Sequence, residues 1–236
     1  MINPTVRTLP AALLTILAMS IGASSALAAD TVDSNQLRLG LYAVFYHSSA
    51  DDLQGPYVPP GVNLKADDVN TLYIGYIRRL SPHFEAELAI GLPPVTKTEG
   101  KGLATVGSVP YAGQVISTAR WFAPTLLFNY KFFDENAAIR PYIGVGVNYT
   151  TFYDRNSTAA GNAASGGPTK LSLTSSVGPS ATFGVSYKFA PHWGSYVSYS
   201  FTKVDSDLTA DTAGIIRTTH IKFAPQALVV SIGYSF

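Results

Sequence analysis

Eight segments of the chain alternate apolar and polar residues, and the gaps between them are alternately long and short. The gaps hold 22, 3, 23, 5, 21, 3 and 14 residues. Tight turns at one end and long loops at the other are typical of an up-and-down meander of antiparallel strands. We therefore predict an all-β fold, an eight-stranded antiparallel up-and-down transmembrane β-barrel. The predicted strands are Gln36–His47, Asn70–Leu80, Phe84–Val95, Ala119–Phe133, Ile139–Tyr153, Ser175–Phe189, Trp193–Asp205 and His220–Ser235.

The two faces of each predicted strand differ in character. In the first strand, Leu37, Leu39 and Leu41 share one face, while Arg38 and Tyr42 share the other. A soluble barrel of the lipocalin type would turn its apolar face inward and present a Lys- and Glu-rich face to water. Here the second face is mostly Gly, Ser, Tyr and Asn, which suits a narrow polar lumen. We therefore expect the apolar face to meet lipid.

Composition supports this interpretation. Charged residues make up 13% of the chain, against roughly 25% in soluble domains. Downstream of the N-terminus, no apolar run approaches the ~20 residues that a membrane-spanning helix needs. The formal net charge of +1 gives no indication of a nucleic-acid partner, and the absence of cysteine excludes disulfides and thiolate chemistry.

The N-terminus is typical of a secretory signal peptide. Arg7 provides a positive start, an apolar stretch runs from Leu9 to Met19, and Ala26 and Ala28 form a small-x-small cleavage pattern. We predict a signal peptide over residues 1–28 and an outer-membrane barrel over residues 29–236. The alternative is a membrane anchor, but the apolar stretch is short for that role.

Aromatic residues gather near the predicted strand ends, where a membrane meets water. We expect two girdles of rings, although aromatic residues also favour strands in general. One girdle, near the short turns, would contain Tyr130, Phe132, Tyr187, Phe189, Trp193, Tyr234 and Phe236. The other, near the long loops, would contain Phe45, Phe122, Tyr149 and Phe201.

Several stretches resemble the OmpW family of outer-membrane proteins, which includes the AlkL-type hydrocarbon importers. The resemblance covers essentially the whole chain after the signal peptide, and the segment from Arg140 to Phe152 is the most specific part. The matching sequences are Pro-His-Phe-Glu-Ala-Glu-Leu-Ala at 82–89, Pro-Thr-Leu-Leu-Phe-Asn-Tyr at 124–130, Arg-Pro-Tyr-Ile-Gly-Val-Gly-Val-Asn-Tyr-Thr-Thr-Phe at 140–152, and the C-terminal Ser-Ile-Gly-Tyr-Ser-Phe at 231–236.

The resemblance implies a passive, porin-like channel in the outer membrane of a Gram-negative bacterium. Small hydrophobic solutes would enter a narrow apolar lumen from outside and leave sideways into the membrane. Such a channel lowers the barrier that charged, tightly packed lipopolysaccharide sets against apolar molecules. The expected partners are outer-membrane lipid and lipopolysaccharide, the solutes, and the barrel-assembly machinery, with the protein acting as a monomer and using no cofactor.

The family comparison also suggests where the passage narrows. The family often has an aromatic residue where this chain has Val177, and the constriction opposite falls at Ala89. Because both residues are small, we expect a wider constriction or one formed by Leu92 or Trp121. Val177 has outward parity by simple counting, but a bulge at Pro179 would turn it inward.

Charged residues on the inward face suggest a plug. Arg38, Arg79 and Arg140 share this face with Glu85 and Glu87. Buried opposite charges would pair and seal the barrel toward the short turns. A seal is compatible with sideways exit, and equally with an alternative function as a structural or receptor barrel. Continuous apolar lining in the outer half of the lumen would favour transport, and ion pairs throughout would favour the alternative.

A third interpretation is an outer-membrane enzyme that modifies lipid A. His47, Ser48 and Ser49, with Asp51 and Asp52 nearby, loosely resemble the His-x-Ser pattern of PagL-type deacylases. A histidine that activates a serine is workable chemistry. The simpler interpretation is a strand that runs into a polar loop. None of the four histidines has the spacing of a metal site, so we predict no catalytic, cofactor or metal residues.

Overall fold

The computed structural model describes residues 34–106 and 108–236. The predicted signal peptide, residues 1–28, lies outside the described residues. Within the described part of the chain, no helix is both long and apolar enough to cross a membrane.

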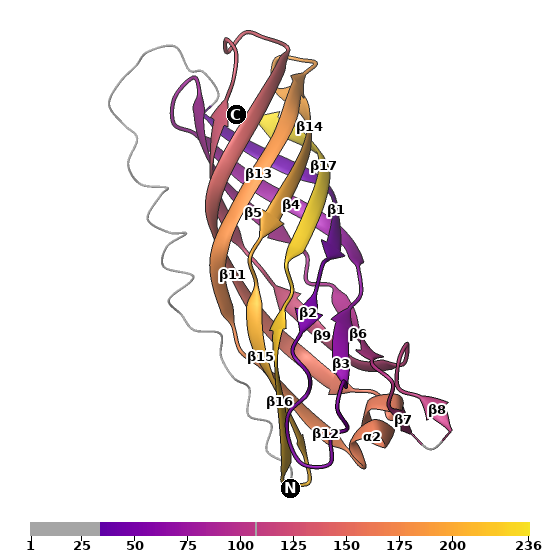
Figure 1. Cartoon of the computed structure of the whole chain (residues 1–236). Coiled ribbons are helices and arrows are strands. Elements are labelled where there is room, and N and C mark those ends of the chain that lie inside the picture. Colours follow the sequence, from indigo (N-terminus) through magenta and orange to yellow (C-terminus); the bar gives the residue numbers. More distant parts are fainter. Residues whose placement is uncertain (1–33, 107) are drawn as a thin grey trace, which may run out of the picture. The chain divides into compact units, whose positions relative to one another are not determined.

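Eight antiparallel strands form a closed ring (Figure 1). Each strand pairs with the next in the ring, and the ring closes where β1 pairs with β17. This confirms the predicted eight-stranded up-and-down barrel. The strands are β1 (Asn35–Tyr46), β4 (Val69–Arg79), β5 (Phe84–Gly91), β10 (Thr125–Lys131), β11 (Ile139–Ser157), β13 (Ser176–Lys188), β14 (Trp193–Thr202) and β17 (Pro225–Ser235).

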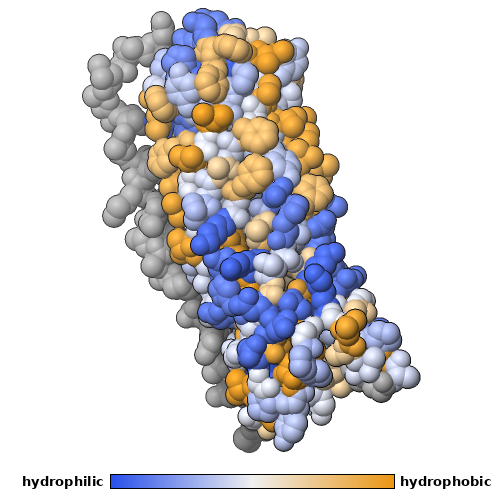
Figure 2. Space-filling view, viewed as in Figure 1, coloured by the Kyte–Doolittle hydropathy of each residue, from blue (hydrophilic) through white to orange (hydrophobic). Residues whose placement is uncertain are grey.

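The two faces of the strands lie as the alternation predicts. Leu37, Leu39 and Leu41 in β1 are exposed on the outside of the barrel, whereas Arg38 and Val44 are buried inside it. Apolar side chains on an outer surface and a guanidinium inside reverse the arrangement of a soluble protein. Figure 2 shows apolar residues spread over the barrel surface, next to a band of hydrophilic residues on the adjoining outer extension.

The long gaps, which the spacing predicts as loops, contain strands and one short helix in their described residues. They build an extension beyond the barrel, made mainly of two small sheets. One contains β3 (Asn63–Ala66), β6 (Val95–Lys101), β9 (Val115–Phe122) and the outer part of β11. The other contains β2 (Ser49–Ala50), β12 (Thr169–Leu173), β15 (Asp205–Thr212) and β16 (Ile215–Lys222). A short hairpin, β7 (Thr105–Val106) with β8 (Val109–Pro110), and one short helix, α2 (Ala159–Ser165), complete the described extension.

Four of the predicted strands run across a break where the barrel meets this extension. The breaks at residues 92–94 and 123–124 contain prolines, a third lies at residues 203–204, and the fourth lies at residues 223–224, where Ala224 has a φ of 39°. Proline has no amide hydrogen to donate to a ladder, and a positive φ interrupts extended backbone. The buried face keeps its parity across the breaks at residues 123–124 and 223–224, so alternation alone could not locate those two.

The apolar core lies inside the extension and continues into the barrel. Tyr111 and Leu208 belong to the extension, while Val44 and Ala227 line the barrel, and all four are buried in the same cluster. The outer half of the lumen and the space between the two small sheets are therefore one apolar interior.

The ring of aromatic side chains expected near the short turns is present on the outer surface. Its members are exposed, and neighbouring rings touch edge to face, as between Tyr130 and Phe132 (5.1 Å) and between Trp193 and Tyr234 (5.0 Å). Near the other end, Phe45 and Phe201 are also exposed, while Phe122 and Tyr149 are half-buried. The two levels bracket the apolar band, as interfacial aromatic residues do in membrane barrels.

A charge introduced on the apolar face tests this orientation. Leu41 is 67% exposed, so Leu41→Arg would be harmless in a soluble protein. In lipid we expect it to lower the free energy of unfolding by roughly 2–4 kcal/mol. Urea titration of the barrel refolded into lipid vesicles measures this loss. Leu103→Arg, at a fully exposed position of the extension, is the control and should leave the titration unchanged; equal behaviour of the two variants would contradict the orientation.

Candidate functional site

A cluster of paired charges fills the inner end of the lumen, toward the short turns. Arg38 is 2% exposed and lies 3.4 Å from Glu87 and 3.5 Å from Glu85. The Lys131 ammonium lies 3.1 Å from the other oxygen of Glu85. The Arg38 guanidinium also lies 3.7 Å from the centre of the Tyr196 ring, a cation–π contact. These contacts span the barrel, because the residues come from β1, β5, β10 and β14.

Hydrogen bonds complete the pairing of Glu87. Tyr73 donates its hydroxyl to one carboxylate oxygen at 2.5 Å, and Asn129 donates its amide to the other at 2.7 Å. All three side chains are buried. A buried carboxylate is stable only with such partners. Arg38, Glu85 and Glu87 therefore lie together in the inner lumen, in a network whose carboxylates are paired with cations.

The other two predicted lumen charges lie at the rim. Arg79 pairs with Glu135, in the turn between β10 and β11, which corrects its assignment to the central cluster. Arg79 is the last residue of β4, so its long side chain extends beyond the lumen to the turn. Arg140 donates to the backbone carbonyls of Pro82 (2.8 Å) and Phe133 (3.1 Å), and so binds two short turns together.

Four members of the cluster were missed by the sequence analysis: Tyr73, Asn129, Lys131 and Tyr196. The sequence contains a signal that each of these residues faces the lumen. Tyr130 and Phe132 were assigned to the outward girdle, so Lys131 between them had to point inward. The same parity places Tyr73, Asn129 and Tyr196 on the lumen face. Alternation does not give the position of each strand along the barrel axis relative to its neighbours. That position decides which inward residues contact one another.

A small cavity of about 30 Å³ lies next to Glu87, and hydroxyl groups dominate its lining. Ala89, Gly91 and Leu127 form part of its wall, and Glu87 supplies its charge. We call it the hydroxyl pocket. Its Ser and Thr residues are Thr125, Ser180, Thr182, Ser198, Ser200 and Thr202.

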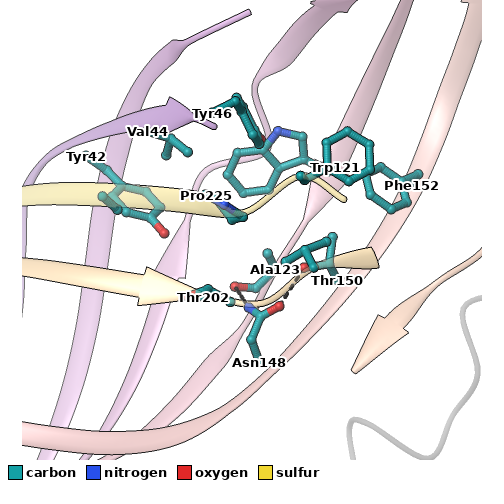
Figure 3. A pocket seen from close by; sticks show the side chains of 13 residues that line it. Tyr42, Val44, Tyr46, Trp121, Ala123, Asn148, Thr150, Phe152, Thr202 and Pro225 are labelled. Carbon is teal, nitrogen blue, oxygen red and sulfur yellow. Dashed lines mark hydrogen bonds between the residues drawn. The ribbon is translucent and has the colours of Figure 1, made fainter. Parts of the chain in front are cut away.

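A second cavity of about 30 Å³ lies toward the extension and is lined mainly by apolar groups (Figure 3). We call it the apolar cavity. Trp121 is 4% exposed, and its indole N–H donates to Thr96 at 2.9 Å, which fixes the ring. Asn148 is the main polar group, and it is satisfied by Thr125 and Thr150. The apolar side chains of the lining are Tyr42, Val44, Tyr46, Trp121, Ala123, Phe152, Val204, Phe223, Pro225 and Ala227.

The structure separates the four residues predicted to line the passage. Ala89 lines the hydroxyl pocket, and Trp121 lines the apolar cavity. Leu92 (43% exposed) and Val177 (71% exposed) point outward, which corrects their assignment. No bulge turns Val177 inward, because the register between β11 and β13 runs without a shift through Pro179. Leu92 follows the buried Gly91 and takes the opposite face.

The ladders of the barrel wall are interrupted beside these cavities. The ladder between β5 and β10 ends at Ala89 and Thr125, and the ladder between β6 and β9 begins at Val95 and Arg120. We call the stretch between these pairs the seam. It contains Pro93, Pro94 and Pro124, which have no amide hydrogen to donate. Ala123 and Gly91, which lie within the seam, line the two cavities.

The residues of the enzyme alternative lie at the outer end of β1. The Ser48 hydroxyl accepts a hydrogen bond from the amide of Ala66 at 3.1 Å, and Asp52 accepts one from Asn63 at 3.4 Å. Within the described residues, no hydrogen bond joins His47 to Ser48 or Ser49. The hydroxyl of Ser48 thus bonds to the backbone of β3.

Comparison with known proteins identifies the family of this chain. The OmpW family matches residues 34–236. Outer membrane protein W of Vibrio cholerae is 26% identical over 200 residues, which cover 85% of this chain and 87% of that protein. The dibenzothiophene metabolism operon protein PahQ of Pseudomonas aeruginosa is 28% identical over 120 residues, covering 50% of this chain and 52% of that protein.

Two solved structures share the fold. The crystal structure of the outer membrane protein OprG from Pseudomonas aeruginosa matches with a TM-score of 0.77 and 21% identity, covering 86% of this chain and 96% of OprG. The outer membrane protein AlkL matches with a TM-score of 0.64 and 16% identity, covering 92% and 97%. With the closed barrel, its apolar outer face and the family match over residues 34–236, the chain belongs to the OmpW family of outer-membrane proteins.

Proposed function

We propose that this barrel is a passive channel through which small hydrophobic molecules cross the outer membrane. The observation that carries the proposal is the division of the lumen. Its outer part has a mainly apolar lining, whereas the cross-barrel ion pairs among the described residues lie at the inner end. An apolar solute gains free energy by leaving water for the outer half.

The cluster of ion pairs at the inner end favours release of the solute sideways into the membrane. A solute on a straight path would have to break buried ion pairs, each of which costs several kcal/mol to disrupt. At the seam, by contrast, few backbone hydrogen bonds need to open, and the lipid outside is apolar. We propose that solutes pass from the apolar cavity to the membrane between Pro93 and Pro124. Because each cavity is small, side chains such as Trp121 must shift as a solute passes.

A relative supports the class of solute. The protein PahQ takes its name from a dibenzothiophene metabolism operon, and dibenzothiophene is an apolar aromatic compound. We extend this class, small and hydrophobic, to the present chain. We also propose that the barrel works as a monomer in lipopolysaccharide-containing membrane, since it closes on itself, and that the barrel-assembly machinery inserts it.

The second candidate function is a structural or receptor barrel with a sealed lumen. The ion cluster around Arg38 favours it, because paired charges stiffen a barrel without any need for passage. It does not account for the apolar outer lumen or for the prolines at the seam. Uptake measurements separate the two functions.

Filling the apolar cavity tests the channel. Ala123→Trp places a large ring beside Trp121, and we expect uptake of labelled octane by cells to fall about tenfold, equivalent to a barrier higher by ~1.4 kcal/mol. Val177→Trp is the matched control on the outer face and should leave uptake unchanged. Heat-modifiable gel migration verifies insertion. If cells with and without the inserted protein take up octane at the same rate, the structural or receptor barrel becomes the better account.

Locking the seam tests the exit. The chain has no cysteine, so Val95→Cys with Arg120→Cys introduces one defined pair at neighbouring positions of the ladder. We expect oxidation to reduce octane uptake several-fold and a reductant to restore it. The control pair Phe201→Cys with Gln226→Cys joins β14 to β17, away from the seam. Equal loss in both pairs, or in neither, would argue against sideways release at this position.

A further inference from the structure

The two lumen cavities are neighbours with opposite chemical character. Tyr42 and Thr202 line both of them, so the apolar cavity and the hydroxyl pocket adjoin. A purely apolar path would not need a polar compartment beside its exit. The pairing suggests a ligand with two parts, an apolar body and a polar head.

The hydroxyl pocket has hydrogen-bonding capacity to spare. Ser180 and Thr202 bond to each other at 2.9 Å, and Thr182 donates to the carbonyl of Tyr199 at 3.3 Å. Each of these hydroxyl oxygens keeps a further lone pair. Ser200 is half-buried in the same pocket, and its hydroxyl makes no hydrogen bond to any described residue. A small donor and acceptor group would therefore find partners here.

The charges around the pocket limit the kind of head. Glu87 is the charged residue of its lining, and its oxygens already accept bonds from Tyr73 and Asn129 and pair with Arg38. An anionic head would meet this carboxylate with no cation in the lining. A cationic head would lose its hydration beside a carboxylate whose charge Arg38 already offsets and whose two oxygens each already accept a hydrogen bond. A neutral head, such as a hydroxyl, avoids both costs.

We propose that the hydroxyl pocket is a subsite for the neutral polar head of an amphiphile, such as a medium-chain alcohol. The hydrocarbon chain of the ligand lies in the apolar cavity, and its head lies beside Ser200 and Thr182, in the pocket that Gly91 of the seam also lines. This inference rests on the proposed function, because it names a solute class for the same passage. A site that offers hydrogen bonds discriminates against an analogue that lacks the matching group. The barrel therefore prefers an alcohol to the alkane of equal length.

The test compares uptake of labelled 1-octanol and octane by cells that produce the full chain, with cells lacking it as the baseline. The variant Ser200→Ala with Thr182→Val removes two hydroxyls with little change in volume. We expect protein-dependent uptake of 1-octanol to fall about threefold to tenfold, the value of roughly one buried hydrogen bond, while octane uptake stays unchanged. Octanoate should be taken up poorly by the unmodified protein and by the variant.

Two further variants keep the result interpretable. Ser200→Ala alone breaks no hydrogen bond, so it should fold normally and show a smaller loss in the same direction. Ser195→Ala, on the same strand with its side chain on the outer face, is the control and should change neither uptake. Unchanged 1-octanol uptake in the double variant, or a parallel fall for both solutes, overturns the subsite and leaves the channel standing. If neither solute needs the protein, both proposals fail.

Discussion

Hydrocarbon offers no water to a backbone amide or carbonyl, so every strand in a membrane must find a partner on both sides. The eight ladders of this barrel satisfy that demand around a full ring, from the β1–β17 pair to the β10–β11 pair. Ring closure then fixes which side chains face lipid and which share the lumen. The prolines of the seam interrupt this ring of ladders beside the two cavities of the lumen.

Inside the ring, the lumen changes character along its length. Charges pair at the inner end, hydroxyls line the middle, and apolar groups fill the outer part and continue into the extension. Such an order is energetically consistent, because the buried charges have nearby partners and the apolar groups gather where they exclude water. Under the proposed function, the paired charges at the inner end leave the seam as the exit for an apolar molecule.

Much of this arrangement could be predicted from the two-residue alternation of the strands alone. Alternation placed Leu41 outside and Arg38 inside, and gap lengths fixed the order of the strands. Other features depend on information that alternation does not contain. Whether Arg79 meets Glu87 or a turn residue depends on strand heights. Whether Val177 turns inward depends on a bulge at Pro179 that did not form. The strands of the extension were missed because their polar, short segments resemble loops.

The central claim, that an apolar solute occupies the outer lumen, can be tested with the chain's own fluorophores. Of its two tryptophans, Trp121 lines the apolar cavity and Trp193 faces outward. With Trp193→Phe, Trp121 reports alone on the barrel in lipid vesicles. We expect 1-bromooctane to quench this fluorescence strongly, and lipids brominated on their chains, which cannot enter the lumen, to leave it nearly unchanged. Quenching by 1-bromooctane no stronger than by the brominated lipids would contradict the account.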